Sequence, residues 1–278
     1  MPITGWLTVA PEKKEEKEAK EDDSTKALVG MMMGSENASK SKVVDSETLV
    51  AQTQDRLWRA LKRRYQYDSS LQPAQKYLLD HVSSKIPLVI MYADLVGSTN
   101  MSMSLPVDKL VTIIRSFTQE MSSVVESHDG LVLKYVGDAI IAFFPASYNR
   151  YMACDKAVQC AKSMITVVKN GINPILNQYD YPELAVKIGA DVGDNVIVQY
   201  GHDKSSPIDI LGYCMNIAAK ITSLTGPNKI SIGEDVHSLL HPSEKAKFSE
   251  MKLKPEEWKY RNRQTDQLYR VYAQKEKG

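Results

Sequence analysis

Two aspartates, Asp94 and Asp138, each follow an apolar run of the kind that forms a buried strand. Asp94 closes the run 86–93, and Asp138 stands in a Gly-Asp turn directly after the run 131–136. Mg²⁺ takes oxygen ligands and commonly uses one or two protein carboxylates together with substrate phosphates. The sequence therefore predicts two strand-end carboxylates that share a divalent cation.

A second set of polar residues stands out in or next to predicted strands and helices. Its members are Lys134, Lys187, Asp209, Asn216 and Lys220. Lys134 precedes the Gly-Asp turn on its strand, and Lys187 opens a glycine-containing apolar segment. Asn216 and Lys220 are four residues apart, so they share one face of a predicted helix. Each residue alone has an ordinary structural explanation, and Lys134 with Asp209 could be a simple ion pair.

The spacing of apolar residues predicts an α+β fold with one mixed sheet and helices on one face. We expect strands over 86–93, 131–136, 139–144, 185–191, 195–200, 229–233 and about 267–273. We expect helices over about 106–127, 148–172, 212–224 and 234–240.

The chain divides into three predicted parts. Residues 1–44 include a run of Glu, Lys and Asp that predicts a disordered charged tail. Residues 45–84 carry a rough apolar stripe that predicts a helical segment, either packed on the domain or used for dimerisation. Residues 85–278 are expected to form the main folded domain. The source of an upstream regulatory signal is not indicated.

Composition excludes several classes of protein. The formal net charge is +1 over 278 residues, which does not favour binding to nucleic acid. No apolar run approaches the roughly 20 residues that span a bilayer, and the N-terminus lacks the pattern of a secretory signal. The three cysteines form no CxxC pair and are expected to be reduced. We therefore expect a cytoplasmic protein.

Four segments, in the same order, resemble the motifs of class III nucleotidyl cyclases. They are Ala93–Thr99, Lys134–Asp138, Lys187–Gly193 and Asp209–Lys220. The family patterns are F-x-D-(I/L)-x-G-(F/S)-T, K-x-x-G-D, R-V-G-I-H-x-G and D-x-x-G-x-x-V-N-x-A-x-R. The resemblance implies that residues 85–278 form a nucleotidyl cyclase catalytic domain, whose fold is a ferredoxin-like mixed sheet.

The resemblance also assigns a role to each candidate residue. It implies two Mg²⁺ or Mn²⁺ ions at each site, held by Asp94, Leu95 and Asp138. The substrate phosphates would meet Gly97, Ser98, Thr99 and Lys187. Lys134 and Asp209 would bind the base, with a polarity that suits adenine better than guanine. Asn216 would orient the ribose, and Lys220 would stabilise charge on the α-phosphate.

The expected activity is that of an adenylyl cyclase, which converts ATP to cyclic AMP and pyrophosphate. The family divides its site residues between two subunits, so the resemblance implies a head-to-tail homodimer with shared sites. Lys220 departs from the usual Arg, and lysine lacks the planar fork of a guanidinium. Two alternatives stay open: a catalytically weak nucleotide-binding regulatory module, and a guanylyl cyclase. Asp191 and Ser98 are smaller departures from the family patterns.

Overall fold

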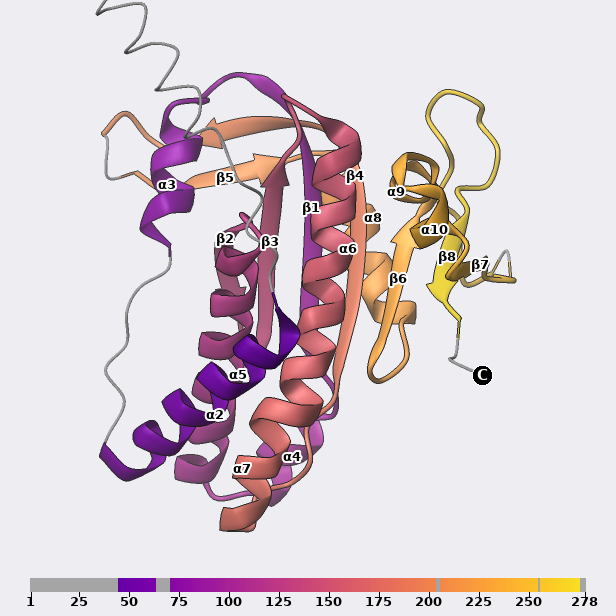
Figure 1. Ribbon diagram of the computed structural model, residues 1–278. Coiled ribbons are helices and arrows are strands. Elements are labelled where there is room, and N and C mark those ends of the chain that lie inside the picture. Colours follow the sequence, from indigo (N-terminus) through magenta and orange to yellow (C-terminus); the bar gives the residue numbers. More distant parts are fainter. Residues whose placement is uncertain (1–44, 64–70, 204–205, 255, 276–278) are drawn as a thin grey trace, which may run out of the picture. The chain divides into compact units, whose positions relative to one another are not determined.

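The computed structural model describes residues 45–63, 71–203, 206–254 and 256–275, so the predicted tail over 1–44 lies outside the described residues. The described residues group into one compact unit. Its centre is a sheet with the strand order β2-β3-β1-β4-β6-β8-β7, in which β5 pairs with β4 (Figure 1). β4 and β6 run parallel, whereas the other neighbours are antiparallel. The predicted α+β class with a mixed sheet is confirmed.

The strands are β1 (Lys85–Leu95), β2 (Leu131–Val136), β3 (Ala139–Pro145), β4 (Val186–Gln199), β5 (Ile208–Leu211), β6 (Lys229–Gly233), β7 (Phe248–Glu250) and β8 (Val271–Gln274). The α-helices are α2 (Ser46–Arg63), α3 (Gln72–Leu79), α4 (Ser98–Ser104), α5 (Val107–Ser127), α6 (Arg150–Thr166), α7 (Asn173–Leu176), α8 (Tyr213–Leu224), α9 (Glu234–Leu239) and α10 (Pro242–Lys245). A π-helical turn, η1 (Val167–Ile172), continues α6, and a 3₁₀ turn, η2 (Asn177–Tyr179), follows α7.

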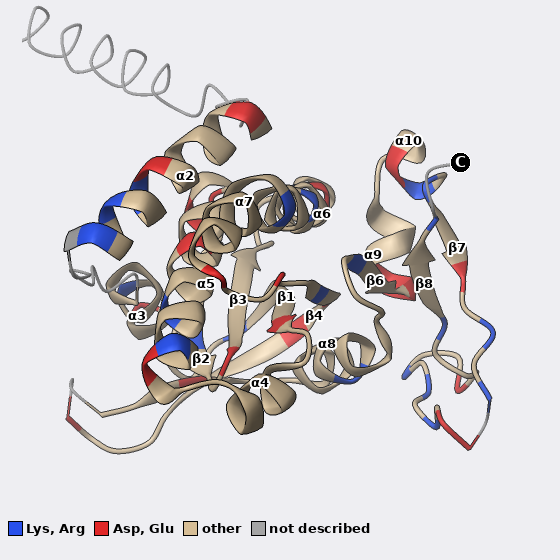
Figure 2. Cartoon of the chain, turned by 90° about the horizontal axis from the view of Figure 1, so that it is seen from below, with Lys and Arg blue, Asp and Glu red and all other residues tan. Residues whose placement is uncertain are grey.

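The central strand β1 is buried on both faces because successive side chains of a strand point in opposite directions. Val89 and Met91 belong to the core formed with α5 and α6. Leu88 and Ile90 belong to a second core, formed with α3 and α8. Figure 2 shows α6 and α8 on opposite sides of the sheet. Helices therefore pack on both faces, not on one face as the sequence predicts, and α8 brings Asn216 and Lys220 to the face opposite α6.

The strand β4 corrects a prediction. Apolar spacing predicts two strands here, 185–191 and 195–200, separated by residues 192–194, but the backbone continues through this gap as one strand. A Cβ atom on Gly193 would lie 3.2 Å from the Cβ atom of Cys214. The glycine therefore serves the close approach of α8 to the sheet rather than a turn. The partner of the far end of β4 is β5, which apolar spacing did not reveal.

The segment predicted to be helical over 45–84 contains α2 and α3. Asp45 caps α2, since its carboxylate accepts from the backbone N–H of Thr48 at 3.1 Å. Thr53 in α2 donates at 2.7 Å to Glu120, a fully buried carboxylate of α5 that also pairs with Arg56. This contact fixes α2 on α5. A role in dimerisation stays a prediction. No described helix is both long enough and apolar enough to cross a membrane.

Candidate active site

The structure brings Asp94 and Asp138 to the same end of the sheet. Ala93 in β1 pairs with Ile140 in β3, so continuing this antiparallel register places Asp138 beside the last residues of β1. Gly137 makes the β2–β3 turn with φ +63°, a left-handed conformation that glycine adopts without strain. One carboxylate oxygen of Asp138, Oδ2, is buried and accepts no hydrogen bond from the described residues.

Asp94 differs from Asp138 because it already has a cationic partner. The Lys187 ammonium lies 2.9 Å from its Oδ2 atom, and the two residues are register partners on β1 and β4. Each side chain is roughly a quarter exposed, at 28% for Asp94 and 27% for Lys187. The two aspartates therefore present one neutralised carboxylate and one oxygen without a partner.

The donor set at this end fits a divalent cation that also has phosphate ligands. An unpaired buried carboxylate oxygen is costly unless something positive or hydrogen-bonding meets it. The described residues contain no cluster of three or more His, Cys, Asp or Glu side chains that could hold a metal. Two carboxylates nevertheless suffice for Mg²⁺ when a substrate phosphate completes the shell. The side chain of Leu95 is buried, so only its backbone carbonyl could be a ligand.

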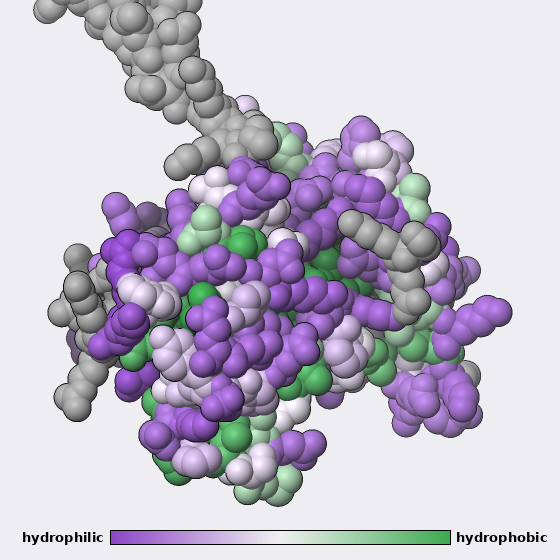
Figure 3. All heavy atoms as spheres, turned by 60° about the horizontal axis from the view of Figure 1, so that its bottom comes forward, coloured by the Kyte–Doolittle hydropathy of each residue, from purple (hydrophilic) through white to green (hydrophobic). Residues whose placement is uncertain are grey.

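The residues after Asp94 form a loop and the short helix α4. Gly97 adopts φ +77° directly before α4, and a Cβ atom there would meet nothing within 4 Å. Ser98 is partly exposed and Thr99 is exposed. Next to them, Met103 and Val107 are 75% exposed. Figure 3, which turns this end of the molecule forward, shows apolar side chains scattered among hydrophilic ones.

Lys134 and Asp209 meet, although they are 75 residues apart in the chain. The Lys134 ammonium donates to Oδ2 of Asp209 at 2.6 Å. A register shift in β2 between Val132 and Lys134 re-aims the lysine, and β5 supplies the aspartate. The second oxygen of Asp209 accepts from the backbone N–H of Ile210 at 2.9 Å. The pair is oriented but only partly buried, with Lys134 40% exposed.

A hollow of about 470 Å³ lies beside the first turn of α8. Asn216, Tyr92 and Arg263 are among its lining residues. Burial, and then the charge of Asp209, raise the pKa of Tyr92. Tyr92 packs against the core cluster that contains Leu133 and Ile210, the neighbours of Lys134 and Asp209 in the chain. Lys220 is exposed one turn further along α8, outside the hollow.

Two residues of this hollow were missed by the sequence reasoning. Tyr92 stands two positions before Asp94, so the period of a strand could have placed both on one face. Arg263 lies in the long connection between β7 and β8, with its guanidinium 4.3 Å from the ring centre of Tyr213. No motif or spacing in the sequence indicates that this arginine approaches α8.

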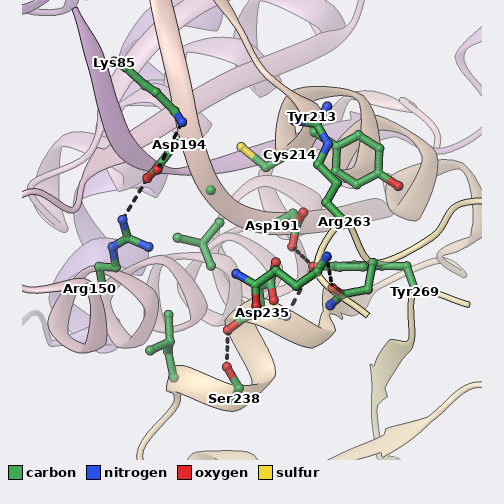
Figure 4. A pocket seen from close by; sticks show the side chains of 15 residues that line it. Lys85, Arg150, Asp191, Asp194, Tyr213, Cys214, Asp235, Ser238, Arg263 and Tyr269 are labelled. Carbon is green, nitrogen blue, oxygen red and sulfur yellow. Dashed lines mark hydrogen bonds and ion pairs between the residues drawn. The ribbon is translucent and has the colours of Figure 1, made fainter. Parts of the chain in front are cut away.

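A second hollow of about 470 Å³ adjoins the first at the N-terminus of α8 (Figure 4). Asp194 there pairs with Arg150 at 2.8 Å and with Lys85 at 3.7 Å. Asp191 is almost fully buried and accepts a hydrogen bond from Tyr269 at 2.7 Å. Burial raises the pKa of Asp191 well above its usual range.

The candidate residues thus fall into separate groups within one chain. Neither hollow beside α8 is lined by any of the candidate charged residues Asp94, Asp138, Lys134, Asp209 and Lys220. The cation-binding candidates lie at the end of β1, and the candidates for binding the base and ribose lie on β2, β5 and α8. Neither hollow could therefore serve alone as an active site that uses all the candidate residues.

Comparison with known proteins adds independent findings. A family model described as the adenylate and guanylate cyclase catalytic domain matches residues 82–269. A cytidylate cyclase of Escherichia coli is 24% identical over 173 residues, which cover 59% of this chain and 37% of that protein. The chain therefore spans little more than a third of that relative.

Two solved structures share the fold at low identity. The adenylyl cyclase CyaB from P. aeruginosa superposes with a TM-score of 0.57 at 19% identity, covering 70% of this chain and 96% of that chain. The guanylyl cyclase Cya2 superposes with a TM-score of 0.58 at 19% identity, covering 69% and 93%. At this identity the likeness establishes the fold but not the substrate.

Proposed function

Because the chain belongs to the family of adenylate and guanylate cyclase catalytic domains, we propose that it is a nucleotidyl cyclase that prefers ATP. In this reaction the ribose 3′-oxygen bonds to the α-phosphorus, and the bond from that phosphorus to the bridging oxygen of the β-phosphate breaks. The 3′-hydroxyl loses its proton, and pyrophosphate leaves. The products are cyclic AMP and pyrophosphate.

The observation that carries this proposal is the Lys134–Asp209 pair, with 2.6 Å between ammonium and carboxylate. An ammonium only donates hydrogen bonds and a carboxylate only accepts them. Together they suit a base edge with a ring nitrogen that accepts beside an amino group that donates. Adenine presents N1 and N6 in this arrangement. Guanine presents an N–H donor and an oxo acceptor, which is the opposite polarity.

Cytosine is the second candidate, because its N3 and N4 atoms repeat the acceptor and donor order of adenine. One of the relatives is named a cytidylate cyclase, which adds weight to this alternative. The Lys134–Asp209 pair therefore supports amino bases over oxo bases without separating a purine from a pyrimidine. Base size, and thus the width of the site between β2 and β5, would decide between ATP and CTP.

The remaining residues support the proposal through their positions. Asp94 and Asp138, with the Leu95 carbonyl, would hold two Mg²⁺ or Mn²⁺ ions. Such ions, when bound, lower the pKa of the attacking hydroxyl and neutralise the leaving pyrophosphate. Asn216, exposed on α8, would hold the ribose, and Lys220 would place a positive charge beside the α-phosphate.

Phosphate binding completes the proposed site. Gly97, Ser98 and Thr99 would contact the triphosphate through backbone N–H groups and hydroxyls. Lys187 would contribute a point charge from β4, and Arg263, already in the hollow with Asn216, could reach the same anion. A guanidinium can bind a phosphate with two parallel hydrogen bonds.

We propose that the working unit is a head-to-tail homodimer, because neither hollow beside α8 is lined by the candidate charged residues. In a dimer with a two-fold axis, the end of β1 in each protomer would face β2, β5 and α8 of its partner, which creates two equivalent sites. Lys220 keeps the alternative of a weak, regulatory cyclase domain open, since Lys offers no bidentate contact.

The test is a cyclisation assay with ATP, CTP, GTP and UTP, each with Mg²⁺ and with Mn²⁺. We expect cyclic product from ATP, a smaller yield from CTP, and no product from GTP or UTP. Asp94→Asn is the control that should abolish all products. A preference for GTP would contradict the role of Lys134 and Asp209. No cyclisation of any nucleotide, in a protein that still binds ATP, would support the regulatory alternative.

A further inference from the structure

We propose that the ammonium of Lys187 occupies the place of a metal ion at Asp94 until a nucleotide binds. Lys187 then leaves the Asp94 carboxylate and pairs with the triphosphate. The inference rests on the metal-binding role given to Asp94 above. It adds a second state to Lys187, which the proposed function treats only as a phosphate ligand. The exchange would couple loading of the metal site to arrival of the substrate.

The ion pair is built into the sheet. Asp94 and Lys187 are directly opposed on the antiparallel strands β1 and β4, and the ammonium lies 2.9 Å from Oδ2. Asp94 has no other ion-pair partner among the described residues. The pairing of the two backbones keeps the lysine within reach of the carboxylate, whatever occupies the rest of the site.

Asp138 provides the contrast within the same site. Its Oδ2 atom is buried without a hydrogen-bond partner, whereas Oδ2 of Asp94 is engaged by Lys187. A divalent cation that approaches the two aspartates therefore meets one ready carboxylate and one that is already neutralised. To bind Asp94 the cation must displace the ammonium or tolerate a positive charge close by, and like charges repel at this range.

A triphosphate removes this obstacle. Its negative charges offer the ammonium a stronger partner than one partly exposed carboxylate, and the flexible four-carbon stem of lysine allows the move. The metal then gains Asp94 and phosphate ligands together. Because coupling between two bound ligands is reciprocal, nucleotide would tighten the metal and metal would tighten the nucleotide. Without nucleotide, Lys187 would keep the metal weakly bound.

The experiment measures Mn²⁺ binding to the full chain without nucleotide, from the electron paramagnetic resonance signal of free Mn²⁺. Lys187→Met removes the competing charge and should tighten Mn²⁺ by up to about fivefold, which corresponds to the roughly 0–1 kcal/mol that a partly exposed ion pair contributes. Lys187→Arg retains the charge and should bind Mn²⁺ as the wild type does.

Lys156→Met is the matched control. Its ammonium, on α6, lies 2.7 Å from Asp129 in the connection between α5 and β2, away from the candidate site, so Mn²⁺ affinity should not change. A second measurement uses 3′-deoxy-ATP, which lacks the attacking hydroxyl. With this nucleotide the order should reverse, and Lys187→Met should bind the nucleotide more weakly than the wild type.

Two further outcomes separate the inference from the proposed function. The double variant Lys187→Met with Asp94→Asn should lack the additional Mn²⁺ affinity of Lys187→Met. This result would confirm that the Mn²⁺ ion binds at Asp94. Unchanged or weaker Mn²⁺ binding in Lys187→Met, with wild-type binding that Asp94→Asn abolishes, overturns the exchange but leaves the metal site. Mn²⁺ binding that neither Asp94→Asn nor Asp138→Asn affects overturns the metal site itself, and the exchange with it.

Discussion

Mixing two inactive variants should restore activity if the site is shared between protomers. Asp94→Asn removes a candidate metal ligand at the end of β1. Asn216→Ala removes a candidate ribose ligand that is exposed on α8, so the fold should be retained. Alone, the loss of one well-placed polar contact to a transition state costs on the order of 10²- to 10³-fold in rate. Each pure variant should therefore be nearly inactive.

The yield of the mixture follows from two-fold symmetry. Random exchange of equal amounts makes about half of the dimers mixed. In a mixed dimer one site receives both substitutions, while the other receives Asp94 from one protomer and Asn216 from the other and is intact. Half of the dimers with half of their sites working gives about a quarter of the wild-type rate.

The assay is formation of cyclic nucleotide after the purified variants have been mixed and allowed to exchange. The matched control mixes Asp94→Asn with Asp138→Asn. Both changes lie in the same half-site, so every composite site stays defective and no activity should return. Exchange itself is followed with differently tagged chains. If the tags show mixed dimers but the first mixture stays as inactive as its parts, the shared-site reasoning is wrong.

Four further predictions concern single residues. Lys220→Arg should raise kcat up to about tenfold with little change in KM, because a guanidinium can make paired contacts to a phosphate; an unchanged kcat would remove Lys220 from the chemistry. Arg263→Ala should raise KM for the nucleotide roughly tenfold or more by deleting a charge-assisted contact, and Arg263→Lys should recover part of that loss; equal KM values in all three proteins would exclude Arg263 from the site. Glu120→Ala should lower the free energy of unfolding by about 2 kcal/mol, since a buried carboxylate that holds Arg56 and α2 is lost; a urea titration measures this, and an unaltered midpoint would contradict it. Burial raises the pKa of Asp191, so protonated Asp191 contributes fully to the free energy of unfolding below the ordinary pKa of about 3.9. This contribution is lost as the pH rises through the raised pKa. Asp191→Asn should make the free energy of unfolding, measured by urea titration, depend less on pH, and an unchanged pH dependence would refute the raised pKa of Asp191.

Some elements were predictable because their signals are local. The apolar runs of β1, β2, β3 and β6, and the helical spacing of α5 and α8, lie within single stretches of sequence. The error in β4 has a different origin. Gly193 and Asp194 interrupt the apolar run, and only the close approach of Cys214 to Gly193 explains a glycine inside a continuous strand.

Local sequence signals also identify only part of the candidate site. Motif spacing identified Lys134, Asp209 and the two strand-end aspartates as residues worth testing, and their roles stay predictions. The pairing of Asp94 with Lys187 depends on the register between β1 and β4, which no local pattern specifies. Arg263 reaches the hollow beside α8 from a loop without regular structure. Contacts that depend on long-range register or on loops therefore need the folded chain.

The two ion pairs of the candidate site share one physical consequence. Lys187 is neutralised by Asp94, and Lys134 is neutralised by Asp209, so the chain without substrate presents two satisfied pairs instead of four separate charges. Each pair is partly exposed, and such pairs contribute little to stability, about 0–1 kcal/mol. Opening them therefore costs little. A nucleotide that offers an acceptor and a donor to one pair, and a polyphosphate with its cation to the other, replaces both at once. A ligand with only a matching base or only a polyphosphate opens one pair, so the arrangement favours whole nucleotides over their parts.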